Sequence, residues 1–338
     1  MRTLHLTTSN FDSIFNQLND QLDGNCTRNL KEYVFEFSNE CGYGTIRGAK
    51  VKGRISFIEF NLTFNDDVKL IIESPVEKSV NFMYCAEGTL QHSFGDMSKS
   101  QKLEAFQTGI ISNIRSHKNV LFIEKDNRLN SSLITVDCTA NEKGKNVLTN
   151  QLKETFISNK NEDFIYVGSY NLKIAEKIQQ LNAISQEGVV RTLLIEGLVH
   201  IILALELQQH KRDLQKKSQD TGSLTKREMK AIRELSEFIN NYPETSLTVS
   251  ELCAKAGLSS AKLQEGFKRM HNHTVNDYIR EVRVKKSEEL IKTTDLNISQ
   301  IVYTVGFSSR SYFSKIFKQK YNCSPNEYKA RNKMAISA

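Results

Sequence analysis

Long hydrophobic runs are missing from this sequence. The most apolar stretch, Leu193–Leu207, contains Glu196, His200 and Glu206 and falls short of the roughly 20 apolar residues that a membrane-spanning helix needs. The amino terminus, MRTLHLTTSNFDSIF, has no apolar core followed by small residues, so we expect no secretory signal. These absences predict a soluble, cytoplasmic protein without a membrane partner.

Cysteine pairs and metal-binding patterns are missing as well. The six cysteines lie far apart, without a CxxC pair, at Cys26, Cys41, Cys85, Cys138, Cys253 and Cys323. In a chain of 338 residues we interpret them as reduced thiols rather than as a disulfide framework or a zinc site. His92 and His117 belong to no His-x-His pattern, and the sequence suggests no nucleophile–base set. We therefore expect no metal, no cofactor and no enzymatic activity.

Positive charge is present but unevenly distributed. Residues 223–338 hold 20 Lys/Arg against 12 Asp/Glu, whereas residues 1–222 hold 26 against 27. The whole positive excess therefore lies in the carboxy-terminal third. This asymmetry predicts a polyanionic partner for that third, with a merely solvated basic surface as the alternative.

The pattern of apolar residues predicts an α+β protein with more than one domain. Residues 31–138 contain short alternating segments such as KEYVFEFS and RISFIEFNLTF, separated by turn formers. Their spacing, which is roughly ten residues, favours a cupin-like barrel or sandwich. Helical patterns follow within 147–214, and the charged run 208–220 predicts a linker. We expect a β-rich sensor or dimerisation domain at 1–222 and an all-helical domain at 223–338.

The last helical pattern of the first domain, at 189–214, has one apolar face. That face consists of Val190, Leu194, Leu198, Ile201 and Leu205. By default such a helix packs on its own domain, and dimerisation is the alternative. The two roles are compatible.

The carboxy-terminal third contains one pattern twice. AGLSSAKLQEGFKRMHNHTVNDY (256–278) and VGFSSRSYFSKIFKQKYNCSPNEY (305–328) share a glycine, an apolar residue and Ser-Ser, then Phe-Lys and a terminal Asn-acid-Tyr. In each copy a short helix ends at Gly257 or Gly306, and Ser259 or Ser308 is placed to cap the next one. We expect helix-turn-helix units at about 248–270 and 297–320, joined by a helix at about 275–293.

The outward side chains of these units suit the major groove of DNA. We expect the stripes Leu263, Phe267, Met270 and Tyr312, Ile316, Phe317 to be buried. The outward residues are then Ser260, Ala261, Lys262, Gln264 and Lys268 in the first copy and Ser309, Arg310, Ser311, Ser314, Lys315 and Lys318 in the second. Arg and Lys can pair with guanine, Gln with adenine, and Ser with phosphate or base.

The joining helix sets the expected partner. At 1.5 Å per residue it is roughly 28 Å long, close to the roughly 34 Å between successive major grooves on one face of a duplex. We therefore expect double-stranded DNA, contacted in two adjacent major grooves. Glu265 and Gly266 interrupt the first unit, so the second unit is expected to contribute more to base recognition.

Residues 224–333 resemble the DNA-binding domain of the AraC/XylS transcriptional regulators. In ISQIVYTVGFSSRSYFSKIFKQKYNCSPNEY, the motifs Gly-Phe-Ser, Ser-Tyr-Phe, Phe-Lys and Ser-Pro-x-x-Tyr have the spacing of that family. The resemblance implies a bacterial, sequence-specific transcription factor, usually an activator that works with RNA polymerase. It also implies an amino-terminal domain that senses a small-molecule effector or forms a homodimer.

The first domain is similar to the pyochelin-regulator branch of that family in GYGTIRGAKVKGRISFIEF and NFMYCAEGTLQHSF. This similarity implies sensing of a ferric siderophore or a similar ligand, and control of iron, siderophore or other uptake genes. The sequence assigns no ligand-binding residues. Two alternatives stay open: a metal-dependent cupin enzyme with a nucleic-acid-binding tail, and a constitutive regulator whose first domain only oligomerises.

Overall fold

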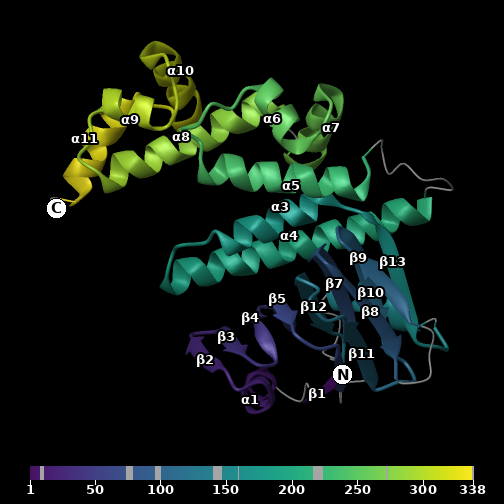
Figure 1. Ribbon diagram of the computed structural model, residues 1–338. Helices are drawn as coiled ribbons and strands as arrows, with labels where there is room; N and C mark the ends of the chain where they lie inside the picture. Colours follow the sequence, from purple (N-terminus) through teal and green to yellow (C-terminus); the bar gives the residue numbers. More distant parts are fainter. Residues whose placement is uncertain are drawn as a thin grey trace. The chain divides into compact units, whose positions relative to one another are not determined.

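The chain consists of two compact units. The computed structural model describes residues 1–7, 11–73, 79–95, 100–139, 147–158, 160–215, 224–271 and 273–336. Contacts divide the chain into Met1–Thr221 and Gly222–Ala338, and each unit is described by itself (Figure 1). The predicted boundary at 222/223 and residues 216–220 of the predicted linker lie outside the described residues.

The first unit is built on β-sheets. In its described part, a five-stranded sheet has the order β1–β6–β11–β8–β9, and an eight-stranded sheet has the order β13–β10–β7–β12–β5–β4–β3–β2. The strands are β1 Arg2–Thr7, β2 Asn25–Asn29, β3 Glu32–Asn39, β4 Gly42–Val51, β5 Ile55–Phe64, β6 Val68–Glu73, β7 Ser79–Glu87, β8 Thr89–Phe94, β9 Gln101–Glu104, β10 Gln107–Ser112, β11 Lys118–Ile123, β12 Leu129–Asp137 and β13 Phe164–Tyr170. Both strand orders are open, so the described strands form no closed barrel. The β-rich character of this unit is confirmed, and the barrel is not.

The strand sequences explain which faces are buried. In β3, Tyr33, Phe35 and Phe37 alternate with more exposed residues, as expected for a strand with one face toward the core. β5 and β7 are buried along almost their whole length. Their nearly continuous apolar sequences suit strands that are covered on both faces.

A helix that the sequence analysis did not predict, α1 (Phe11–Leu22), covers part of this core. Its buried residues recur at helical spacing, and the Phe15 ring stacks on Tyr33 with 4.9 Å between centroids. Gly48 of β4 permits this approach, because a Cβ there would lie 2.5 Å from the Phe15 ring. The helix thereby completes the apolar interior between the two sheets.

The helical segments predicted within 147–214 correspond to α2 (Val147–Lys153) with the π-helical turn η1 (Glu154–Ser158), α3 (Leu172–Asn182) and α4 (Gly188–Gln215). The strand β13 lies between η1 and α3 and was not predicted. The first part of the predicted linker, 208–215, is the end of α4. Figure 1 shows α3 and α4 side by side, and the two helices are in contact.

The apolar face predicted for α4 is the wrong one for burial. Val190, Leu194 and Ile201 are 56%, 41% and 46% exposed. The face that packs on the unit instead carries Ile195, Val199, Ile202, Leu203 and the polar residues Glu206, Gln209 and His210. The helix is apolar on two sides, so the sequence pattern did not distinguish them. Among the described helices, α4 alone has the length and composition to cross a membrane, contrary to the prediction from the shorter stretch Leu193–Leu207.

The described part of the second unit contains helices and no strand. They are α5 Lys226–Asn241, α6 Val249–Ala256, α7 Ser260–His271, α8 Val275–Thr293, α9 Ile298–Thr304, α10 Arg310–Tyr321 and α11 Pro325–Ile336. Figure 1 shows α8 running between the pair α6–α7 and the pair α9–α10. One apolar cluster joins the second half of α8 to α9 and α10.

Candidate nucleic-acid interface

The first helix-turn-helix unit is formed by α6 and α7. Thr248 caps α6 in a capping box with Glu251, and α6 ends at Gly257, which is left-handed with φ 63°. The hydroxyl of Ser259 accepts a hydrogen bond from the Lys262 backbone at the start of α7. The predicted stripe of Leu263, Phe267 and Met270 is fully buried. The opposite side of α7 is therefore the one available to a ligand.

The second unit, formed by α9 and α10, has the same plan with a turn that is one residue longer. Gly306 has φ 88°, and Ser309 rather than Ser308 caps α10, accepting from the Tyr312 backbone. The buried stripe is Phe313 and Phe317, both at 0% exposure, whereas Tyr312 is 45% exposed. The prediction that Tyr312 faces inward is wrong, because it aligned the two copies at their glycines. Phe267 matches Phe317, 50 residues on, although Gly257 matches Gly306, 49 residues on.

The outward side chains of α10 are free in the described part of the chain. Arg310, Ser311, Lys315 and Lys318 are exposed and Ser314 is half-buried, and none makes a side-chain hydrogen bond or ion pair with another described residue. The structure brings these predicted residues together on one side of one helix. A basic and hydroxyl-bearing face without internal partners can bind phosphates and base edges.

The corresponding residues of α7 are partly engaged within the protein. Lys262 forms an ion pair with Glu228 of α5, and the Gln264 carbonyl oxygen accepts from the Val275 backbone at 3.2 Å. The bond from Lys262 helps to hold the pKa of the Glu228 carboxyl below its usual value. Ser260, Ala261 and Lys268 are exposed. The first helix-turn-helix unit therefore offers fewer outward side chains without an internal partner than the second helix-turn-helix unit does.

Gly266, which interrupts α7, has a structural explanation. A Cβ at this position would lie 2.4 Å from Cγ1 and 2.5 Å from Cδ1 of Ile232, a fully buried residue of α5. α7 therefore approaches α5 more closely than a side chain would allow. The glycine serves the close contact between the two helices rather than the surface of α7.

Arg283 of α8, which the sequence pattern did not indicate, bridges the α5–α6 loop and the turn of the second helix-turn-helix unit. Arg283 of α8 donates from Nε to the Pro243 carbonyl at 2.8 Å and from Nη2 to the Thr245 carbonyl at 3.0 Å. Its guanidinium also lies 5.9 Å from the Phe307 ring centroid and against Gly306, where a Cβ would be 2.9 Å away. The α5–α6 loop and the α9–α10 turn thus meet at one side chain. In the sequence Arg283 is one of several basic residues on a helix, and nothing distinguishes it.

His271, the last residue of α7, and His273, two positions later, lie in different surroundings. His271 is buried, stacks on Tyr278 with 3.9 Å between ring centroids, and its Nε2 lies 2.7 Å from the Ser236 hydroxyl. His273 is exposed and lies 3.4 Å from Glu281, and Asn272 is outside the described residues. His271 thus belongs to the core between α5, α7 and α8.

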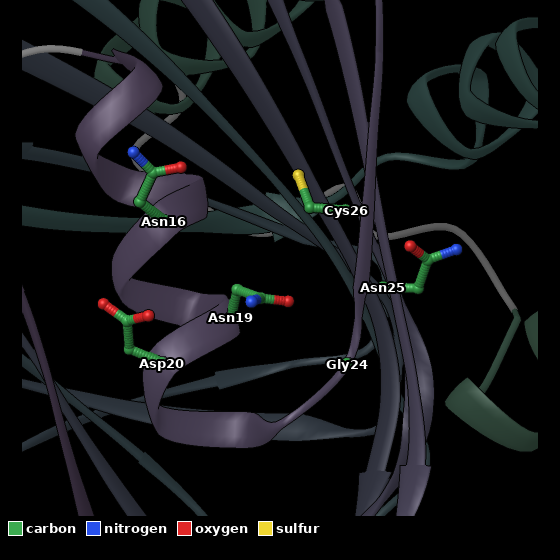
Figure 2. Close-up of a pocket in the computed structure, with 6 residues that line it drawn as sticks. All are labelled: Asn16, Asn19, Asp20, Gly24, Asn25 and Cys26. Carbon is green, nitrogen blue, oxygen red and sulfur yellow. The ribbon is translucent and has the colours of Figure 1, made fainter.

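The amino-terminal unit, Met1–Thr221, offers fewer features of a binding site. Within the described ranges, no group of three or more His, Cys, Asp or Glu side chains could hold a metal ion. Figure 2 shows a polar hollow between α1 and the start of β2, lined by Asn16, Asn19, Asp20, Gly24, Asn25 and Cys26. Its side chains are mostly exposed, and partial burial raises the pKa of the Cys26 thiol, so the thiol is not activated.

Comparisons with known proteins find a match for the carboxy-terminal unit, Gly222–Ala338. Residues 252–331 match a family model described as a helix-turn-helix domain. The chain is 38% identical over 92 residues to histidine kinase P4 of Formosa agariphila, covering 27% of this chain and 7% of that protein. It is 32% identical over 98 residues to the Msm operon regulatory protein of Streptococcus mutans, covering 29% of this chain and 35% of that protein.

A solved structure is also similar to part of the chain. It is that of a probable AraC family transcriptional regulator from Rhodopseudomonas palustris, with 22% identity over 30% of this chain and 97% of that chain and a TM-score of 0.29. The fold and the matched family define α6–α10 as a helix-turn-helix domain. Proteins named as an operon regulatory protein and as a helix-turn-helix-type transcriptional regulator are among the relatives of this domain. The chain spans about a third or less of the length of the two curated relatives described above.

Proposed function

We propose that the protein is a sequence-specific, DNA-binding transcription factor whose two helix-turn-helix units contact adjacent major grooves of one duplex. The observation that carries this proposal is the basic outward face of α10, whose side chains have no hydrogen-bond or ion-pair partner among the described residues. α8 has 19 residues and is about 28 Å long, which suits two reading helices one turn of DNA apart.

A randomised-site selection with the full chain tests this function. We expect enrichment of a bipartite site whose two conserved blocks lie about one helical turn apart, at roughly 10 base pairs. Enrichment of a single short block would restrict base reading to one unit. A pool without any enriched sequence would refute sequence-specific binding.

The protein is further proposed to act as a homodimer through α4. Val190, Leu194 and Ile201 form an exposed apolar stripe, and Gly197 on the same helix has no atom within 4 Å of the place where a Cβ would lie, which leaves room for a close neighbour. Contiguous apolar surface of this kind is typical of an interface. Leu194→Glu should convert the dimer to a monomer in sedimentation velocity, and an unchanged sedimentation coefficient would refute this interface.

The first unit is proposed to be a cupin-like sensor of a small effector, and the protein a cytoplasmic activator that works with RNA polymerase. Control of iron, siderophore or other uptake genes is the corresponding biological role. The two sheets and the helices packed on them support a separate sensing unit. The relatives named as regulators support a non-enzymatic role, and no observation favours the metal-dependent enzyme. A purely oligomerising first unit is the outcome if no effector binds.

A further inference from the structure

The interior of the first unit contains a cavity of about 360 Å³. Residues of α1, β4, β5, β7, β11 and β12 line it, so it lies between the two sheets beneath α1. Small-molecule sites commonly have volumes of about 300–1,000 Å³. Since a water molecule occupies about 30 Å³ of the liquid, the cavity holds a ligand of about a dozen non-hydrogen atoms.

One end of the cavity is a row of polar side chains on neighbouring strands. Ser56 of β5, Thr135 of β12 and Asn81 of β7 are directly opposite one another, and Lys50 of β4 is opposite Ser56. The Thr135 hydroxyl donates to the Asn81 carbonyl oxygen at 2.8 Å. The Asn81 amide group and the Ser56 hydroxyl donate to no other described residue. The row therefore presents unused donors to the cavity.

The other end is apolar. Successive residues of a strand alternate between faces, so Ile58 and Leu133, two positions from the polar row, face the same cavity. Phe60 follows on β5, and α1 adds Phe11, Ile14 and Leu18 from above. The cavity is consequently amphipathic along the direction of the strands.

The charges at the polar end do not cancel. Arg54 and Asp137 both line the cavity and form a pair, with 3.5 Å between Nη1 and Oδ2. Lys50 is 3.2 Å from Asp12, but Asp12 does not line the cavity and is also 3.0 Å from Arg28. The Asp12 carboxylate is thus shared between Lys50 and Arg28. Among the side chains that line the polar end, Lys50 and Arg54 are positive and only Asp137 is negative, so the lining carries an excess of one positive charge.

We propose that this cavity binds a small monoanionic amphiphile, whose head lies against Lys50 and the Ser56–Thr135–Asn81 row and whose apolar body lies between Leu133, Phe60 and α1. The inference rests on the sensing role proposed for the first unit and specifies its ligand class. The charge excess selects an anionic head, and the free hydroxyl and amide donors orient it. The volume limits the apolar body to a few carbon atoms or one ring.

Isothermal titration calorimetry of the full chain with three probes of matching size tests the ligand class. The probes are 4-phenylbutyrate, its neutral amide and the corresponding 4-phenylbutylamine. We expect saturable binding of the carboxylate, roughly tenfold weaker binding of the amide, and no binding of the amine, because hydrogen bonds to a charged group are the stronger ones. Equal binding of carboxylate and amide, or no binding of any probe, would overturn the proposal.

Variants locate the site. Lys50→Met should abolish the preference for the carboxylate over the amide, whereas Lys52→Met, on the same hairpin but outside the cavity, should retain it. Ser56→Ala, which removes only the hydroxyl that is an unused donor, should weaken carboxylate binding several-fold if Lys50→Met does not fold. An unchanged preference in both cavity variants would place the probe elsewhere and reject the site.

The DNA affinity measured with and without 4-phenylbutyrate separates this inference from the proposed function. Carboxylate binding that depends on Lys50 but leaves the DNA affinity unchanged would support the site and argue against ligand-responsive control. Specific DNA binding together with absent probe binding would reject the site and leave the DNA-binding function intact.

Discussion

The outward side chains of α7 and α10 differ in how many already have a hydrogen-bond or ion-pair partner within the protein. Arg310 at the start of α10 is exposed and makes no side-chain hydrogen bond or ion pair with another described residue, whereas Lys262 of α7 is paired with Glu228. Arg310→Ala should weaken binding by about 1–3 kcal/mol and relax the preference at one base pair, because a bidentate arginine–guanine contact is lost. Lys318→Ala, nearer the end of the helix, should weaken all sequences about equally. The measurement is the randomised-site selection repeated with each variant, and an unchanged base preference for Arg310→Ala at every position would end the direct-readout claim.

A second residue-scale prediction concerns Glu206 of α4. Its side chain is completely buried, and neither carboxylate oxygen has a hydrogen-bond partner among the described residues. Burial raises the pKa of this carboxyl well above its usual value, so the folded protein binds a proton that the unfolded chain releases near pH 4.5. The contribution to stability is thus full below pH 4.5 and is lost as the pH rises toward the folded-state pKa, by up to about 1.4 kcal/mol per pH unit.

Glu206→Gln removes this titration. The free energy of unfolding of the wild type, measured relative to Glu206→Gln by urea denaturation, should fall between pH 5 and pH 8, a range of about three units. A difference that stays constant over that range would contradict the assignment.

At the scale of secondary-structure elements, α7 packs against α5 so closely at Gly266 that no methyl group fits between the two helices. Gly266→Ala would gain up to about 1 kcal/mol of helix propensity but force a contact with Ile232 that costs about 1–3 kcal/mol, so we expect net destabilisation. Ile232→Ala should relieve the contact, and the double variant should be more stable than the sum of the two single changes predicts. Thermal unfolding of the four proteins measures these differences, and additive effects would show that the contact is unimportant.

The sequence was informative about these elements where a local rule applied. Gly257 and Gly306 marked the turns because a left-handed residue is needed there, and the apolar spacing placed α7, α8 and α10. It failed where two local patterns compete or a partner is distant. α4 is apolar on two sides, so its buried face could not be chosen. The contacts of Arg283 with carbonyl groups some 40 residues away, and the row formed by Ser56, Thr135 and Asn81, depend on strand register and helix placement.

At the scale of the whole molecule, the proposed DNA binding depends on the spacing of the two helix-turn-helix units, which α8 connects and which we expect Arg283 to help set. Arg283→Met should leave both helix-turn-helix units folded but reduce the discrimination between correctly spaced sites and sites lengthened or shortened by one base pair. Lys285→Met, which removes an exposed charge from the same helix, is the matched control and should leave that ratio unchanged. Binding titrations on a spacing series give the ratio. Equal discrimination in wild type and Arg283→Met would show that α8 alone sets the spacing.

The charge of the whole chain gives one more prediction. The positive excess of the last third should make DNA affinity fall steeply with salt, with a log–log slope near −0.9 for each neutralised phosphate. Lys318→Ala should reduce that slope by about one, if it contacts a phosphate. An affinity that hardly changes between low and physiological salt would contradict a phosphate-contacting surface.

The longer turn before α10 has a consequence for protein engineering. A designer who grafts base-reading residues from α10 onto α7 would align the two copies at Gly257 and Gly306 and transfer side chains with an offset of 49. Beyond the turn the buried positions correspond with an offset of 50, and one residue of a helix is about 100° of rotation. Each grafted side chain would then point about a quarter-turn away from the groove, and Tyr312 would replace Leu263 in the core. A working hybrid needs the offset of 50.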